Sequence, residues 1–128
     1  MAVNYSNTVK DNRMTQVLNA IDGGAGNGSM DIATTSAFTT ILVNIAFSKP
    51  SFSEASQALT LLGVPKSGVA GNTGTAANAR IKDGAGTPNN IITGLTVGTS
   101  GSDINLNSTS ITSGQTVTLT SGTITHAP

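Results

Sequence analysis

The last part of the chain constrains the fold most, because it carries almost no charge. Between residues 94 and 128 the only charged side chain is that of Asp103, and the only imidazole is that of His126. The remainder is mostly Thr, Ser, Gly, Asn and aliphatic residues in short alternating runs. Thr and β-branched residues suit a pleated surface, and Gly–Ser steps end strands. This segment therefore predicts β-sheet whose surface, lacking charge repulsion, favours packing against other copies or a larger body.

Composition excludes several classes of function. Charged residues make up 9% of the chain, against about 25% in an ordinary globular protein. Six basic residues balance six acidic ones, and aromatic residues are only 3%, so neither the basic face nor the stacking aromatics of a nucleic-acid-binding protein is expected. The absence of cysteine excludes disulfides and thiolate metal sites. The length of 128 residues suits a single core.

No membrane or export segment is expected. Residues 1–12 are polar and contain no apolar run typical of a secretory signal. The longest apolar run, residues 41–47, is interrupted by Asn44 and falls far short of the roughly 20 residues that cross a bilayer. We expect a soluble protein that is made in a cytoplasm and has no membrane partner.

One amphipathic helix is predicted over residues 8–21. Thr8 and Asp11 match a capping box, and Gly23 with Gly24 would end the helix. Its apolar side chains recur with helical spacing and so share one face: Met14, Val17, Leu18 and Ile21.

The opposite face of this helix is polar and includes Lys10, Arg13 and Gln16. Two interpretations follow: the helix packs its apolar stripe on a sheet, which we favour because such stripes usually face a core, or it binds a partner. In both cases these three residues are candidates for an interaction surface. The glycines that follow, within residues 23–28, predict a flexible link and not a phosphate loop, because they follow a helix instead of preceding one.

After residue 28 the pattern changes to short runs of period two. Residues 67–74 are expected to form a loop, and the Asp83-Gly84 step predicts a hairpin turn with positive φ. No helical periodicity separates the runs, which disfavours parallel βαβ units. The strand candidates are residues 30–34, 39–47, 58–64, 75–82, 90–97, 103–111 and 115–126.

These runs predict a mainly β fold: an antiparallel, jelly-roll-like β-sandwich of about eight strands with one short N-terminal helix. Residues 1–28 would form the N-terminal segment, with the helix and the Gly-rich link, and residues 29–128 the sandwich domain. The apolar phase changes within the last two runs, from Ile104 to Ile111 and from Val117 to Ile124. Such shifts are typical of β-bulges or of corners between sheets.

The search for chemistry finds no reactive constellation. His126 lies near the chain end, where side chains are usually poorly ordered, and a lone imidazole without cysteine makes a transition-metal site remote. The six carboxylates are not paired in sequence, and no Ca²⁺ loop or G-x-S-x-G elbow occurs. The sequence therefore predicts no enzyme, no catalytic or metal-binding residues and no cofactor.

Arg80 and Lys82 are the remaining candidates. They would share one face of a strand with Ile81 pointing inward, and so form a small basic spot. The simpler interpretation, which we favour, is a solvated strand face. The alternative is a salt-bridge contact with a neighbouring subunit.

Several segments together resemble a known group of proteins. They are residues 4–28 (NYSNTVKDNRMTQVLNAIDGGAGNG), 48–52 (SKPSF), 59–65 (LTLLGVP), 74–87 (GTAANARIKDGAGT) and 97–126 (VGTSGSDINLNSTSITSGQTVTLTSGTITH). Over nearly its whole length the chain is similar to small capsid cement, or decoration, proteins of tailed bacteriophages. The resemblance implies a β-sandwich on the outside of the virion capsid, with the major capsid protein as partner and no catalytic residues.

Self-association into dimers or trimers would cover strand edges that the fold leaves open. Two alternatives to the cement role remain. A carbohydrate-binding or adhesin-like module of a phage tail or fibre would use Thr, Asn and Asp on a sheet face, but the aromatic platforms common in sugar sites are scarce here. A head–tail connector would differ from a cement protein in its copy number per particle.

Overall fold

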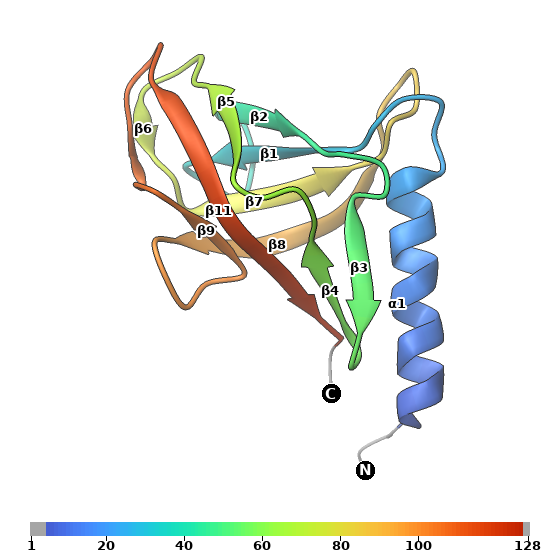
Figure 1. Cartoon of the computed structure of the whole chain (residues 1–128). Coiled ribbons are helices and arrows are strands. Elements are labelled where there is room, and N and C mark those ends of the chain that lie inside the picture. Colours follow the sequence, from blue (N-terminus) through green and yellow to red (C-terminus); the bar gives the residue numbers. More distant parts are fainter. Residues whose placement is uncertain (1–4, 127–128) are drawn as a thin grey trace.

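The computed structural model describes residues 5–126, which form one helix and eleven strands (Figure 1). Residues 1–4 of the predicted N-terminal segment and the last two residues of the sandwich domain lie outside the described residues. The helix α1 spans Asn7–Asp22. The strands are β1 (Ser29–Ala33), β2 (Ile41–Ala46), β3 (Phe52–Ala55), β4 (Ala58–Leu61), β5 (Lys66–Val69), β6 (Gly74–Thr75), β7 (Asn78–Lys82), β8 (Asn90–Gly98), β9 (Ile104–Leu106), β10 (Ser110–Ile111) and β11 (Thr116–Thr125).

Nine strands form one curled sheet. Its order is β2-β1-β7-β8-β9-β11-β4-β3, with β5 also paired to β11, while β10 and β6 form a separate ribbon. Every pair is antiparallel except β8 with β9. The segment after β5 returns to β2, where the Gly71 amide donates to the Leu42 carbonyl at 2.8 Å. The sheet therefore curls into a half-barrel, and the expected sandwich-like β fold with one N-terminal helix is confirmed.

Strand β11 pairs with three other strands. Its residues 116–119 pair with β5, residues 119–122 with β9 and residues 123–125 with β4. The register with β9 shifts between Leu119 and Ser121, which confirms the irregularity predicted from the apolar phase. One long strand thus links β5 and β9 to the β3–β4 hairpin (Figure 1).

The core lies inside the curl of the sheet and under α1. Phe47 and Phe52 meet there edge to face, with ring centroids 5.4 Å apart. The largest fully buried side chains come from the helix and most strands: Phe52, Ile21, Met30, Ile32, Leu42, Ile45, Leu59, Ile81, Ile104, Leu106, Ile111 and Leu119. Because helix and sheet contribute to one cluster, the described chain folds around a single apolar interior.

Helix α1 packs on β3, β4 and β8. Met14 and Ile21 are buried and Val17 and Leu18 pack partly against the core, so the predicted apolar face is confirmed. The predicted start is wrong by one residue and in its mechanism. Ser6 is the N-cap, and its hydroxyl accepts from the Val9 amide at 3.2 Å, so no Thr8–Asp11 capping box forms.

Two strands lie where the sequence predicted none. Strand β3 precedes β4 in a tight hairpin whose turn residues, Ser56 and Gln57, have φ of 52° and 62°. This left-handed turn carries no glycine, and so the usual hairpin signal is missing. Strand β5 occupies part of the predicted loop 67–74, where Gly68 lets it approach β2: an added Cβ would lie 3.0 Å from the Asn44 carbonyl oxygen. The predicted runs 75–82 and 103–111 each divide into two strands, which brings the number above the expected eight.

The Gly-rich link is not a free tether. The Gly26 amide donates to the Gly84 carbonyl at 2.9 Å, and the Lys49 ammonium donates to the Gly24 carbonyl at 2.8 Å. A Cβ on Gly84 would lie 1.9 Å from the Gly26 oxygen, so only glycine fits there. The predicted hairpin between β7 and β8 is confirmed, but Gly84 serves close backbone approach and does not have a positive φ.

Candidate functional site

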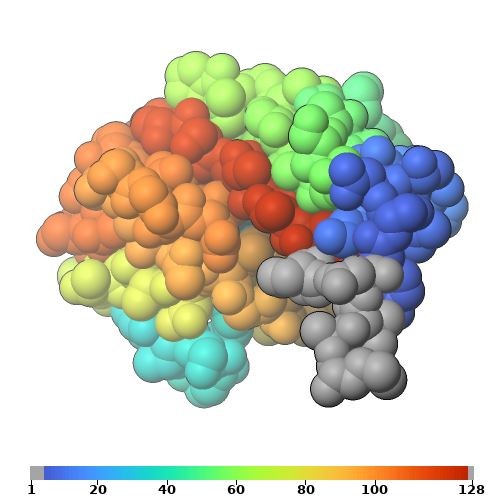
Figure 2. All heavy atoms as spheres, turned by 90° about the horizontal axis from the view of Figure 1, so that it is seen from below, coloured from blue at the N-terminus to red at the C-terminus, as the bar shows by residue number. Residues whose placement is uncertain are grey.

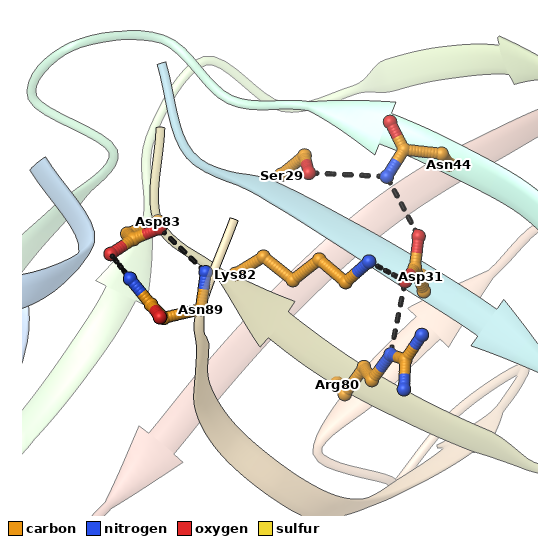
Figure 3. Close-up of polar contacts among 7 residues, drawn as sticks. All are labelled: Ser29, Asp31, Asn44, Arg80, Lys82, Asp83 and Asn89. Atoms are coloured by element: carbon orange, nitrogen blue, oxygen red, sulfur yellow. Dashed lines mark hydrogen bonds and ion pairs between the residues drawn. The ribbon is translucent and has the colours of Figure 1, made fainter. Parts of the chain in front are cut away.

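A cluster of polar side chains surrounds Asp31 on strands β1, β2 and β7 (Figure 3). Cross-strand pairing places Asp31 opposite Asn44 on one side and Arg80 on the other. Its Oδ2 accepts from Arg80 Nε at 3.0 Å and from Lys82 Nζ at 2.9 Å, and its Oδ1 accepts from Asn44 Nδ2 at 2.8 Å. The Asp31 side chain is only 5% exposed. One buried carboxylate therefore holds two cations and an amide.

The electrostatics of this cluster favour an ionised Asp31. Burial alone would raise the pKa of the Asp31 carboxyl, but hydrogen bonds from Lys82, Asn44 and Arg80 outweigh burial and lower it. Two cations around one carboxylate leave the cluster with a net positive charge. The Arg80 guanidinium also lies over the Phe38 ring, 4.5 Å from its centroid, which fixes the guanidinium plane.

The structure brings together two of the five predicted surface residues, Arg80 and Lys82, with Ile81 fully buried between them. Their shared face is confirmed. The expectation of a merely solvated face is wrong, because both cations are tied to Asp31 and their side chains are only 20% and 23% exposed. A salt bridge from either residue to a neighbouring subunit stays a prediction.

The other three predicted residues lie on α1. Arg13 and Gln16 are exposed and Lys10 is half-buried. The Arg13 guanidinium lies 4.7 Å from the centroid of the Tyr5 ring. Within residues 5–126, none of the three shares a hydrogen bond or ion pair with Arg80 or Lys82. The candidate interaction residues therefore form two separate groups, one on the helix and one on β7.

A second polar contact, which sequence reasoning missed, joins α1 to the β3–β4 hairpin. Asp11 Oδ1 accepts from the Gln57 amide at 2.9 Å and from Gln57 Nε2 at 3.0 Å. At the other end of the helix the Asp22 carboxylate accepts from the Ser51 amide at 3.2 and 3.3 Å. Glu54 lies on β3, in the sequence between Ser51 and Gln57, and its Oε2 is buried.

The two carboxyls at this contact titrate in opposite directions. Hydrogen bonds from the side chain and backbone of Gln57 lower the pKa of Asp11. Burial, followed by the neighbouring Asp11 carboxyl, raises the pKa of Glu54. No sequence signal marks this pair, because 43 positions separate its members and the turn that supplies Gln57 was not predicted.

Other carboxylates support turns. Asp83 accepts from the backbone and side chain of Asn89 (Figure 3). It also accepts from the Ala85 amide, and the bonds from Asn89 and Ala85 lower the pKa of Asp83. Asp103 accepts from the amide and hydroxyl of Thr96 at 3.0 and 3.2 Å. These charged groups are thus used inside the fold.

An uncharged surface covers the outer side of β5 and β11. We call the threonine face the exposed or half-exposed set Ser67, Val69, Thr116, Thr118 and Thr120. Pairing places Thr116 opposite Val69 and Thr118 opposite Ser67, while Val117 and Leu119 point into the core. Val69 is 68% exposed. Figure 2 shows the C-terminal segment, in orange and red, as a broad part of the molecular surface.

Neighbouring asparagines hold this face in shape. Asn107 Oδ1 accepts from the Thr118 amide at 3.1 Å, and the Thr120 hydroxyl donates to the Asn105 carbonyl at 3.0 Å. Side-chain hydrogen bonds of this kind fix rotamers before any partner arrives. The threonine face is therefore ordered as well as uncharged.

Within residues 5–126 no pocket opens, and no group of three or more His, Cys, Asp or Glu could hold a metal ion. No helix in that range is long and apolar enough to span a bilayer. Comparisons with protein-family models, curated proteins and solved structures find no match.

Proposed function

We propose that the protein is a structural virion protein of a tailed bacteriophage. In this role it is a capsid cement, or decoration, protein that binds the outer surface of the head and stabilises contacts between major capsid protein subunits. The observation that carries the proposal is the threonine face, which is ordered and uncharged. The resemblance of most of the sequence to such proteins supports the same role.

The threonine face suits contact with a large body for a physical reason. Burying an isolated charge costs far more than burying a hydroxyl that finds a hydrogen-bond partner, and the centres of interfaces are depleted in charged residues. On this face hydroxyls surround Val69, whose exposed side chain supplies apolar area. Since the Thr120 hydroxyl already donates to the Asn105 carbonyl, and the Ser67 and Thr118 hydroxyls lie 3.4 Å apart, little conformational entropy is lost on binding.

Because the same contact is repeated over the capsid, each single contact can be weak. An interface of ordinary size buries on the order of 1,200 to 2,000 Å² in total. A small rigid subunit that touches two capsid subunits at once links them, and its second contact forms at high effective concentration. Dimers or trimers of the protein would extend the same effect and cover open strand edges.

We expect the two groups of candidate residues to supply polar contacts to the capsid outside the threonine face. Lys10, Arg13 and Gln16 on α1, and Arg80 and Lys82 on β7, are polar and partly or fully exposed. Rim charges mainly set the association rate and its dependence on salt. Virion capsid proteins of opposite local charge are the partners that these residues would meet.

A carbohydrate-binding or adhesin-like role in a phage tail or fibre is the second candidate. The hydroxyl and amide groups of the threonine face favour it. Aromatic side chains that could stack on a sugar are scarce: among the four aromatic residues, Phe47 and Phe52 are buried and Tyr5 lies next to Arg13 at the start of α1. Binding to a glycan array, without binding to capsids, would favour this candidate, and a handful of copies per particle would favour a head–tail connector.

The direct test is to add purified protein to undecorated phage shells. We expect saturable binding, hundreds of copies per particle and greater resistance of the shells to heat. Replacement of Thr116 on the threonine face by Lys should weaken binding at least tenfold, because it buries an unpaired charge. The matched control is Thr87→Lys, which introduces the same charge at an exposed threonine in the β7–β8 loop.

Absence of binding by the wild-type protein would refute the cement role. Binding by the wild type and equally by Thr116→Lys would keep the role and refute the threonine face as the contact.

A further inference from the structure

Two carboxyl groups meet where α1 packs on the β3–β4 hairpin. Asp11 is fixed by its two hydrogen bonds from Gln57. Glu54 lies on β3, three residues before the Gln57 amide that binds Asp11, so the two carboxyls are neighbours. Glu54 Oε2 is buried, and it has no hydrogen-bond partner within the described residues. A buried carboxylate oxygen without a donor is costly, and a second carboxylate beside it makes the arrangement less favourable still.

A single proton resolves this conflict. If Glu54 is protonated, its hydroxyl can donate to the Asp11 carboxylate. One bond then gives the buried Glu54 carboxyl a partner and removes the repulsion between two carboxylates. Asp11 is the natural acceptor, because Gln57 already supplies two donors to its negatively charged form. The proton therefore belongs on Glu54 and the charge on Asp11.

The other ionisable groups on α1, β4 and β11 do not change the assignment of the proton to Glu54. Along α1, Arg13 stacks on Tyr5 and Asp22 is bonded to the Ser51 amide at the far end of the helix. Lys10 precedes Asp11 and is half-buried. Strand β4 carries no ionisable side chain, and at the end of β11 His126 donates its backbone amide to the Gln57 carbonyl.

We propose that α1 is held on the hairpin by a proton shared between Glu54 and Asp11, so that helix docking strengthens in mild acid and weakens toward neutral pH. The device is independent of the proposed function. It acts on the part of the fold that covers Met14 and one side of the hairpin. Loosening would make the helix and strand β3 more accessible without unfolding the sheet.

The direction follows from linkage. The pKa of Glu54 is raised by burial and by Asp11, so its contribution is complete below the ordinary value of 4.5 and is lost as the pH rises through the raised value. The pKa of Asp11 is lowered by Gln57, so its contribution is complete above 3.8 and is lost as the pH falls further. Docking is therefore strongest between these two ordinary values. Above them, the undocking constant rises by up to about tenfold per pH unit until Glu54 is ionised in both states.

Hydrogen exchange of the α1 amides in the full chain tests the device. Glu54→Gln keeps a donor for Asp11 at every pH, so wild type and variant should exchange alike near pH 4. At pH 7 the wild type should exchange several-fold faster than the variant. Taking the ratio at each pH cancels the intrinsic pH dependence of exchange. The matched control, Asp83→Asn in the β7–β8 loop, should leave the ratio to wild type unchanged with pH.

A ratio that stays constant from pH 4 to pH 7, or faster exchange in Glu54→Gln at pH 7, would overturn the proposal. A second measurement does not depend on the variant folding: NMR titration of the Glu54 carboxyl in the wild-type chain. We expect its pKa above 4.5, and a decrease in Asp11→Asn. A Glu54 pKa at or below 4.5 would equally refute the shared proton.

Discussion

Asp31 and Glu54 are both carboxyls with buried oxygens in the same small protein, yet their surroundings differ completely. Asp31 lies at the centre of three strands and receives donors from Arg80, Lys82 and Asn44. Glu54 lies between a helix and a hairpin, and its buried Oε2 has no donor in the described part of the chain. The pKa of Asp31 is lowered despite burial, whereas burial and Asp11 raise that of Glu54.

The difference shows how this chain uses its few charges. Within the sheet, a carboxylate and two cations form a closed network that stabilises the register of β1, β2 and β7. At the helix contact, two acidic groups meet and depend on a shared proton. The first region should resist mild changes of pH, and the second should respond to them.

The largest effect is expected for Asp31→Asn. It leaves Arg80 and Lys82 close together without a counter-charge, and should lower the free energy of unfolding by about 2 to 3 kcal/mol. This is below the loss for a fully buried pair, because both cations reach solvent. Chemical denaturation at pH 7 measures it. Glu54→Gln removes a charge of the same sign and should stabilise α1, so destabilisation by both variants would end the comparison.

The loss of stability at low pH is a second test of the difference between Asp31 and Glu54. Because the pKa of Asp31 is lowered, its contribution is complete above the ordinary value of 3.8 and is lost as the pH falls through the lowered value. Asp31→Asn should therefore approach wild-type stability as the pH falls through the lowered pKa of Asp31. A difference between the two proteins that stays constant from pH 7 to pH 2 would show that the carboxylate charge is not the cause.

An intermediate effect is expected for Lys82→Met. Arg80 Nε and Asn44 Nδ2 still bind Asp31 in this variant, and methionine keeps most of the apolar stem. We expect a loss of about 1 kcal/mol. Thermal unfolding at pH 7 measures it, and Lys10→Met on α1, where no ion pair is present among the described residues, is the control with little expected effect.

The smallest effect is expected for Asp22→Asn, at the C-terminal end of α1. Asparagine retains an oxygen that can accept from the Ser51 amide, so only the charge assistance is lost, about 0.5 kcal/mol. Hydrogen exchange of the Ser51 amide is the local measurement. A loss as large as that of Asp31→Asn would mean that the helix contact, not the sheet network, dominates stability.

The elements that sequence predicted well are those with long and clear periodicity. Helix α1 and strands β2, β8 and β11 were found from repeats of apolar residues, and the Arg80–Lys82 alternation was found in the same way. The hairpin β3–β4 escaped because Ser56 and Gln57 adopt left-handed conformations without glycine. Strand β5 escaped because Gly68 resembles a loop residue when its approach to β2 is unknown.

The polar contacts could not be predicted from the sequence, for a different reason. The partner of Arg80 and Lys82 is set by the register of β7 on β1, and a shift of one residue would turn Asp31 to the other face. The pairing of Asp11 with Glu54 depends on how a helix packs on a hairpin, which no local pattern encodes. Sequence therefore located two of the charged side chains on one face, but not the buried carboxylate that binds them.

The contact between Gly26 and Gly84 has a mechanical consequence. Since these two backbones touch and Lys49 binds the carbonyl of Gly24, tension on α1 passes straight into the loop that follows β7. Lys82, which ends β7, lies two residues from Gly84 and forms an ion pair with Asp31. A neighbouring subunit that pulled on α1 would thus transmit force to the ion pairs of Asp31, because hydrogen bonds fix the glycine-rich segment between them.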